Sequence, residues 1–212
     1  MPCALPLLRR LLCRPAAAVP VPDPDPGKDT MPHRPTLLVV SGPPGTGKST
    51  LARALADGLG CPAIIRDEIK QGMVRGAAPA PDGTDHLNLP ARDAFFATLA
   101  VLLKAGVTVV AESAFQDRVW RPGLEPLTEI ADIRVIRCTT STGTLVRRIT
   151  RRAGTDAHRA AHADHTLLAD IAAGRYVPDD FVDITLDLPV LTVDTTDGYA
   201  PGIKELLAFA QG

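Results

Sequence analysis

Residues 42–49, GPPGTGKS, have the spacing of glycines, lysine and serine that binds the phosphates of a nucleotide. Glycines let consecutive backbone amides turn toward one anion, which a Cβ would obstruct. Lys48 supplies a positive charge to the β- and γ-phosphates, and the Ser49 hydroxyl is a ligand for Mg²⁺. The predicted site for a nucleoside triphosphate comprises Gly42, Pro43, Pro44, Gly45, Thr46, Gly47, Lys48, Ser49 and the neighbouring capping residue Thr50.

A carboxylate follows the next apolar segment of the chain. Asp67 comes after Ala63–Arg66, which we predict to be a strand, and Lys70 lies one helical turn further on. Because the carboxyl ends of parallel strands face the ligand crevice, we expect Asp67 beside the phosphate-binding loop. There it can accept the proton of a hydroxyl that attacks the γ-phosphorus. The alternative is an ordinary helix cap with solvated charges behind it.

Arginines gather at residues 147–152, in the sequence RRITRR. Arg148 and Arg152 are i, i+4 neighbours of a predicted helix and share one face. Guanidinium groups make paired hydrogen bonds to phosphate oxygens and neutralise charge that develops during phosphoryl transfer. One triphosphate does not need all of these arginines, so we expect two to act and the others to be solvated. A basic helix that is solvated throughout is the alternative.

Glu112 ends a third apolar segment and is another candidate. Its carboxylate can order magnesium-bound water or an acceptor hydroxyl, or it is an exposed acid at a strand end. Phe115 and Trp120, which follow it, either shape an acceptor pocket or belong to the core.

The same residues discriminate among classes of nucleotide-binding protein. A GTPase needs an N-K-x-D motif, which this chain does not contain. A mechanical ATPase needs an Asp-Glu pair at the end of a later apolar strand, where this chain has the single acid Glu112. A small kinase needs an acceptor-activating carboxylate and an arginine-rich lid, and Asp67 and residues 147–152 are candidates for them. The motifs therefore favour a kinase.

The segments GPPGTGKST, RDEIKQGMV, GVTVVAESAF and LVRRITRR together resemble a group of small P-loop kinases. The group contains the zeta toxins, chloramphenicol phosphotransferase and the kinase domain of polynucleotide kinase. The resemblance covers residues 36–212 in order and spacing. Asp194, Thr195 and Thr196 are similar to a pair near the adenine in these kinases, although backbone and packing usually hold the base there.

The resemblance implies roles for five residues. It implies that Asp67 is the catalytic base, and that Arg148 and Arg152 contact ATP. Lys70 would help to bind phosphate or the acceptor, although arginine is common at this position in the group. Glu112 corresponds to an acidic residue that is aspartate in many relatives. The segment expected to line the acceptor pocket, 73–89, is rich in alanine, proline and glycine and contains no acceptor signature.

Hydrophobic patterning predicts the elements that position these residues. Apolar, β-rich runs predict strands at 36–40, 63–66, 107–111, 133–138 and 190–193. Helical periodicity predicts helices at 48–58, 91–104, 144–152, 160–173 and 203–210. Because strands alternate with helices, we predict an α/β P-loop NTPase fold, with a parallel five-stranded sheet flanked by helices on both faces. The resemblance adds a nucleoside-kinase-like topology with a small arginine-rich lid.

The amino-acid composition indicates how the chain is divided into domains and where in the cell the protein is expected. Nine prolines within residues 1–35 predict an extended tail, which leaves 36–212 as one kinase domain. No apolar run approaches the ~18 residues of a membrane span. Arg9 and Arg10 interrupt the apolar start, which excludes a secretory signal and leaves a transit peptide as an alternative. Four widely separated cysteines fit reduced thiols in a cytoplasmic protein.

The net charge of −1 and the aromatic content of 4% argue against a nucleic-acid partner. We therefore expect a phosphotransferase that moves the γ-phosphate of Mg·ATP to a hydroxyl of a small acceptor. One alternative is a regulatory protein that binds and slowly hydrolyses ATP without an acceptor, and another is a 5′-hydroxyl polynucleotide kinase. The sequence does not discriminate among a drug, a sugar, a nucleoside and a nucleotide sugar as the acceptor. It also does not indicate the oligomeric state.

Overall fold

The computed structural model describes residues 34–76, 86–155 and 164–212. Residues Arg34–Gly212 form one compact unit. The tail expected at 1–35 lies outside the described residues as far as residue 33, as does most of the segment expected to line the acceptor pocket.

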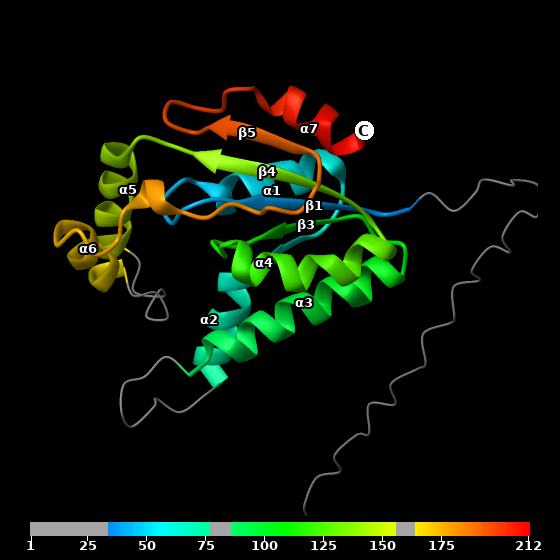
Figure 1. Ribbon diagram of the computed structural model, residues 1–212, viewed down its shortest axis with the longest axis horizontal. Coiled ribbons are helices and arrows are strands. Elements are labelled where there is room, and N and C mark those ends of the chain that lie inside the picture. Colours follow the sequence, from blue (N-terminus) through cyan, green and yellow to red (C-terminus); the bar gives the residue numbers. More distant parts are fainter. Residues whose placement is uncertain (1–33, 77–85, 156–163) are drawn as a thin grey trace, which may run out of the picture. The chain divides into compact units, whose positions relative to one another are not determined.

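Five parallel strands form the centre of the compact unit (Figure 1). They are β1 (Thr36–Ser41), β2 (Ala63–Ile65), β3 (Val109–Glu112), β4 (Asp132–Thr139) and β5 (Val190–Asp194). The strand order is β2-β3-β1-β4-β5. Val40 of β1 pairs with Glu112 of β3, which also pairs with Ile65 of β2, so these three strands end at the same edge. The predicted α/β fold and its parallel sheet are confirmed.

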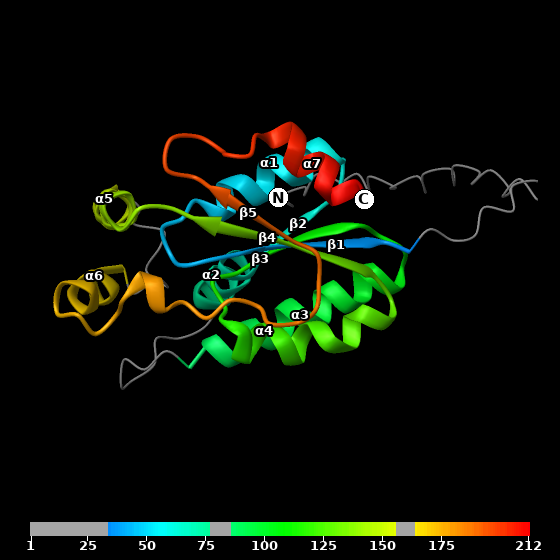
Figure 2. The same ribbon diagram turned by 45° about the horizontal axis from the view of Figure 1, so that its top comes forward.

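Helices cover both faces of the sheet. They are α1 (Lys48–Leu59), α2 (Arg66–Gly76), α3 (Asn88–Lys104), α4 (Asp117–Leu124), α5 (Thr142–Thr155), α6 (Asp164–Ala172) and α7 (Ile203–Gln211). Short 3-10 helices occupy Glu125–Glu129 and Pro178–Asp180. Figures 1 and 2 show α1 and α7 on one face, α3 and α4 on the other, and α5 and α6 beyond the carboxyl ends of the strands.

Alternation along β1 explains why two hydrophobic cores form. Leu37 and Val39 face a cluster that includes Phe95 and Trp120 from α3 and α4. Leu38 and Val40 face the opposite cluster, which contains apolar residues of α1 and α7. Because successive side chains of a strand point to opposite faces, a continuous apolar run such as β1 needs helices on both sides.

The observed elements differ from the predicted ones at the edge that carries the candidate site. The strand predicted at 63–66 ends at Ile65, and Arg66 is the first residue of α2. Glu112 is the last residue of β3 rather than the residue after it. The other predicted strands and helices agree with the structure to within a few residues, and the helix predicted at 160–173 is described from Asp164. Helix α2 was not among the predicted helices.

Helix α4 has no counterpart in the sequence-based prediction. It is eight residues long and contains Pro122 followed by Gly123, which are both unfavourable inside a helix. Burial compensates for this weak local preference, because Trp120 and Leu124 are completely buried. Trp120 therefore belongs to the core, where its Nε1 donates to Ser41 Oγ at 3.1 Å. In the described part of the chain, every helix is too short or too polar to cross a bilayer.

Candidate active site

The phosphate-binding loop joins β1 to α1, and its three glycines all have positive φ angles. Gly42 has a φ of 139°, and a Cβ there would lie 2.3 Å from the carbonyl oxygen of Cys138 in β4. Gly47 caps α1 with a φ of 80°, in the left-handed region that side chains disfavour. A larger residue would push the loop away from β4 or strain the start of α1.

Lys48 is held over this loop by a backbone oxygen. Its Nζ donates to the carbonyl oxygen of Pro43 at 2.8 Å. Lys48 is only 6% exposed. Burial lowers its pKa, while the carboxylates of Glu112 and Asp67 act in the opposite direction. Because the ammonium is poorly hydrated, it attracts an anion in the loop more strongly than it would in water.

Ser49, which is partly exposed, and the buried Glu112 form a hydrogen-bonded pair beside the loop. Ser49 Oγ donates to Glu112 Oε2 at 2.8 Å, and Glu112 is 4% exposed. Burial raises the pKa of Glu112, whereas Lys48 and the hydrogen bond from Ser49 oppose the increase. A hydroxyl and a carboxylate are hard oxygen donors of the kind that Mg²⁺ prefers. These two residues therefore fit a magnesium ion at the phosphates.

Asp67 lies in the first turn of α2, directly after β2. Its Oδ1 is 3.3 Å from Nη1 of Arg66. Because β3 lies between β1 and β2, Glu112 stands between the phosphate-binding loop and the strand that leads to Asp67. The Asp67 charge acts on both Lys48 and Glu112. Lys70, one turn further along α2, is 5% exposed.

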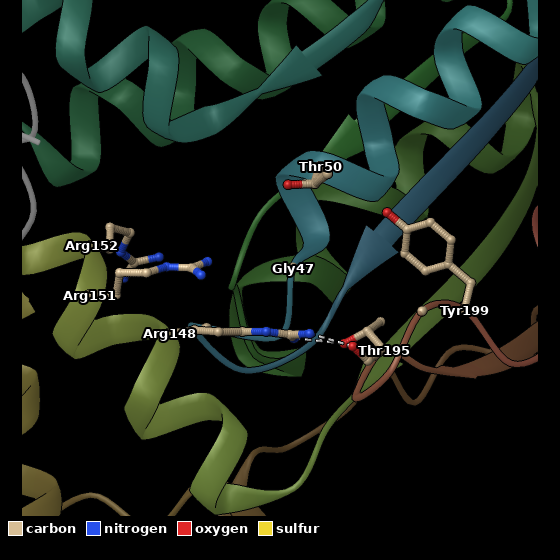
Figure 3. Close-up of a pocket in the computed structure, with 9 residues that line it drawn as sticks. Gly47, Thr50, Arg148, Arg151, Arg152, Thr195 and Tyr199 are labelled. Carbon is tan, nitrogen blue, oxygen red and sulfur yellow. Dashed lines mark hydrogen bonds between the residues drawn. The ribbon is translucent and has the colours of Figure 1, made fainter. Parts of the chain in front are cut away.

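A pocket of about 580 Å³ lies on the other side of the loop, between α5 and the segment after β5 (Figure 3). Figure 3 shows Arg148, Arg151 and Arg152 extending from α5 toward this space. The lining consists of Gly45, Gly47, Thr50, Arg148, Arg151, Arg152, Thr195, Gly198 and Tyr199. The structure thus brings the predicted arginines to the predicted loop. Asp67, Lys70 and Glu112 are not in this lining. Glu112 ends β3, and Asp67 and Lys70 belong to α2, which follows β2.

The two predicted arginines are held by different partners. Arg148 Nη2 donates to the Thr195 carbonyl at 2.5 Å, and its Nη1 to Thr195 Oγ1 at 3.2 Å. Arg152 donates to Asp164 of α6 through Nε at 2.8 Å and Nη2 at 2.5 Å. Since Asp164 is buried, this two-bond ion pair fixes the guanidinium plane of Arg152.

Sequence reasoning missed several pocket residues. It placed Thr195 in a segment similar to one near the adenine in related kinases but assigned it no role. It did not distinguish Arg151 from the arginines expected to be solvated. It gave no role to Tyr199 or to the positioning partner Asp164. The one available signal was the Asp-Thr-Thr sequence after the last strand, because burial and pairing depend on contacts between distant segments.

The sheet and loop together define a P-loop fold of the kinase-like type. A family model described as "AAA domain" matches residues 37–174, and the chain belongs to this family.

Solved structures with the same fold include several described as kinases. A "putative kinase" from Chloroflexus aurantiacus J-10-fl is 30% identical, with a TM-score of 0.73 over 84% of this chain and 98% of that chain. A gluconokinase from Sinorhizobium meliloti 1021 is 20% identical, with a TM-score of 0.52 over 84% and 93%. The APS kinase of Mycobacterium tuberculosis, solved with AMPPNP and APS, is 13% identical, with a TM-score of 0.54 over 84% and 99%.

The comparison with curated proteins gives no match. The solved structures support a kinase, and the narrower similarity to zeta toxins and chloramphenicol phosphotransferase stays a prediction.

Proposed function

We propose that this protein transfers the γ-phosphate of Mg·ATP to a hydroxyl group of a small-molecule acceptor. The observation that supports this most directly is the alignment of Val40, Glu112 and Ile65 across three strands. Because of this register, the segments that carry Lys48 and Asp67 both begin at the same edge of the sheet, and Glu112 lies between them. A kinase needs a phosphate cradle and an acceptor-activating carboxylate in this relation.

In the proposed reaction, the loop amides and Lys48 hold the triphosphate. Ser49 and Glu112 would hold Mg²⁺, which supplies positive charge that offsets the phosphate oxygens. Arg148 and Arg152 contact the phosphates from the side of α5. Their guanidinium groups stabilise the charge that develops on the transferred group.

On the acceptor side, Asp67 accepts the proton from the attacking hydroxyl. The oxygen then forms a bond to the γ-phosphorus as the bond to the β-phosphate oxygen breaks, and ADP leaves. Lys70, one helical turn from Asp67, assists in binding the acceptor or the transferred phosphate. Mg·ATP and the acceptor are the proposed partners, with the reaction in the cytoplasm.

The first experiment incubates the full chain with Mg²⁺ and γ-labelled ATP against pools of hydroxyl compounds. The pools contain sugars, nucleosides, nucleotide sugars, antibiotics and short 5′-hydroxyl oligonucleotides, and Lys48→Ala is the blank. Label in one small-molecule pool supports the proposal and gives the acceptor class. Label in the oligonucleotides supports a polynucleotide kinase instead. Label released only as phosphate, independently of every pool, supports the regulatory ATP-binding alternative.

The proton acceptor is tested with Asp67→Asn. We expect ATP binding to persist and transfer to fall by ~10²-fold or more, the usual scale for loss of a general base. Glu68→Gln is the matched control, because Glu68 is the adjacent acid of α2, is exposed and pairs with Arg53. Full transfer activity in Asp67→Asn would show that this carboxylate is not the base.

A further inference from the structure

Arg66, the first residue of α2, is a nearly buried cation whose hydrogen bonding is incomplete. Its side chain is 11% exposed. Nη2 donates to Asn88 Oδ1 at 2.6 Å and to the Asn88 carbonyl at 3.1 Å. Nε is buried and has no hydrogen-bond partner among the residues that the structure describes. A buried donor without an acceptor is costly, so this nitrogen indicates a missing acceptor atom.

The charge of Arg66 is also only weakly balanced. Its ion pair is with Asp67, through a single contact of 3.3 Å, and the Asp67 side chain is 40% exposed. Asn88 is neutral and contributes oxygen acceptors without a negative charge. Buried guanidinium groups usually make two parallel hydrogen bonds to a carboxylate or phosphate. Arg66 has no such partner in the described part of the chain.

Phe115 fixes the orientation of the Arg66 side chain. The guanidinium carbon lies 5.6 Å from the centroid of the Phe115 ring. That ring packs in turn against Phe95, Phe96 and Trp120, so its position is determined by the core. Phe115 follows β3 and Arg66 follows β2, so both come from the strand ends that carry the proposed acceptor site.

Lys70 adds a second cation on the same side of α2. Arg66 and Lys70 are i, i+4 neighbours and therefore share one helix face. Lys70 is buried, and Arg66 is nearly so. An acceptor whose hydroxyl reaches Asp67 would meet positive charge on either side along α2. This arrangement favours a negatively charged acceptor and disfavours a cationic one.

We propose that Arg66 binds an oxyanion group of the acceptor, a carboxylate or a phosphate, and that the acceptor is a small organic anion with a free hydroxyl. This proposal rests on the proposed function and names the chemical class of its acceptor. The oxyanion supplies the acceptor for Nε and the charge that Arg66 lacks, while the hydroxyl lies at Asp67. A neutral acceptor supplies neither.

The test measures acceptor binding separately from transfer. The full chain is saturated with Mg²⁺ and AMPPNP, so that the phosphate-binding loop is filled and cannot bind the probe. Calorimetry then compares glycerate with glyceramide, and glycerol 3-phosphate with glycerol. We expect the anion of at least one pair to bind about ten- to a hundredfold more tightly than its neutral partner, the scale of charged hydrogen bonds. The pair that shows the difference identifies carboxylate or phosphate.

Three variants assign this preference to Arg66. Arg66→Gln should remove it, and Arg66→Lys should restore part of it, because lysine keeps the charge but cannot bond an oxyanion through a planar pair. Asn88→Ala removes the side-chain acceptor of Arg66 and leaves the backbone carbonyl of residue 88 in place. It should keep the preference, which separates anion binding from the side-chain link to α3. Arg92→Gln is the control, since Arg92 pairs with the adjacent exposed Asp93 on α3.

The outcomes separate this proposal from the proposed function. Equal binding within both pairs, or an unchanged preference in Arg66→Gln, overturns the oxyanion site. Loss of the preference in Asn88→Ala as well shows that Arg66 acts only as a link to α3, and also overturns it. Anion binding without transfer of label from ATP supports the site and contradicts the kinase. Transfer to neutral acceptors, unchanged in Arg66→Gln, supports the kinase and contradicts the site.

Discussion

The hydroxyl of Thr195 donates a hydrogen bond of 2.7 Å to the carbonyl oxygen of Thr46, inside the phosphate-binding loop. The two residues are 149 positions apart in the chain. The backbone amide of Thr195 also donates to the Thr139 carbonyl at the end of β4, at 2.9 Å. Arg148 of α5 donates to the Thr195 carbonyl. The buried residue Thr195 thus connects the phosphate-binding loop, β4 and α5.

Thr195→Val should weaken both the fold and nucleotide binding. Valine has nearly the same volume but leaves the Thr46 carbonyl without this donor, a loss of about 1–3 kcal/mol in unfolding free energy. Urea unfolding and ATP titration measure the two effects. Thr196→Val is the control, because the Thr196 hydroxyl pairs with Thr140 rather than with the loop. Equal effects from the two variants would contradict a special role for Thr195.

Asp164→Asn should reduce transfer by releasing Arg152. The neutral amide cannot hold the guanidinium through two charge-assisted bonds, so we expect kcat to fall about tenfold to a hundredfold, with a smaller change in ATP affinity. Asp170→Asn is the matched control on the same helix, since its partner Arg175 is exposed. If steady-state kinetics give the same kcat for both variants, Arg152 does not depend on Asp164.

Cys138 should be unreactive in the folded protein. Burial raises the pKa of its thiol to about 12, and the thiolate is the species that alkylating agents attack. We expect peptide mapping after iodoacetamide treatment at pH 8 to find Cys138 unmodified in the native protein and modified in urea. Modification of native Cys138 as fast as of the half-buried Cys61 would contradict this.

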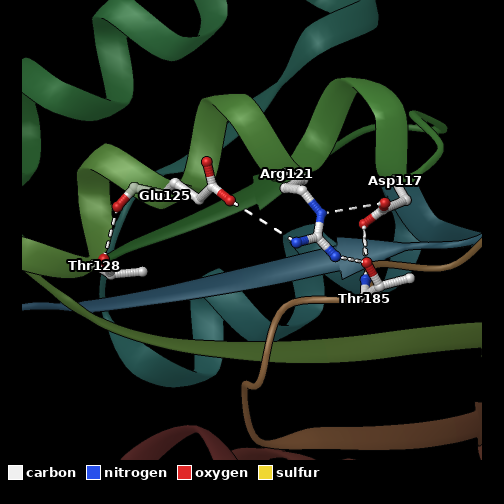
Figure 4. Close-up of polar contacts among 5 residues, drawn as sticks. All are labelled: Asp117, Arg121, Glu125, Thr128 and Thr185. Atoms are coloured by element: carbon white, nitrogen blue, oxygen red, sulfur yellow. Dashed lines mark hydrogen bonds and ion pairs between the residues drawn. The ribbon is translucent and has the colours of Figure 1, made fainter.

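Asp117 should make stability depend on pH at the acidic end. Its carboxylate accepts hydrogen bonds from the Thr185 amide at 2.8 Å and the Thr185 hydroxyl at 3.0 Å, and pairs with Arg121 (Figure 4). The bonds from Thr185 hold the pKa of Asp117 below its usual 3.8, with a smaller contribution from Arg121. Because the folded pKa is the lower one, the stabilisation is complete above pH 3.8 and is lost as the pH falls through the folded value.

Asp117→Asn should therefore lower the unfolding temperature at pH 7 by about 1–3 °C, the scale of an ion pair near the surface. The difference from the unmodified protein should shrink as the pH falls below 3.8, because the carboxylate of folded Asp117 is protonated only below its lowered pKa. Glu125→Gln is the control, since Glu125 contacts Arg121 only at 3.9 Å. Thermal unfolding at several pH values measures the effect, and a difference that is constant with pH would exclude the carboxylate as its cause.

Local sequence patterns were sufficient to predict the phosphate-binding loop, the sheet and several candidate site residues. The phosphate-binding loop was predictable because its eight residues are contiguous and each has a separate chemical requirement. The sheet was predictable because strands buried on both faces are continuous apolar runs, as in β1. Asp67 and Glu112 were predictable as candidates because they follow such runs, at the edge where ligands bind in parallel sheets.

Only the tertiary structure decided which of these groups meet. The crossover that inserts β3 between β1 and β2 gives Glu112 its position beside Ser49, and no local signal specifies that strand order. The partners of Arg148 and Arg152 come from the end of β5 and from α6. The buried environment of Arg66 requires α3 and Phe115. Such contacts depend on how the chain packs, because burial and pairing are properties of the assembled core.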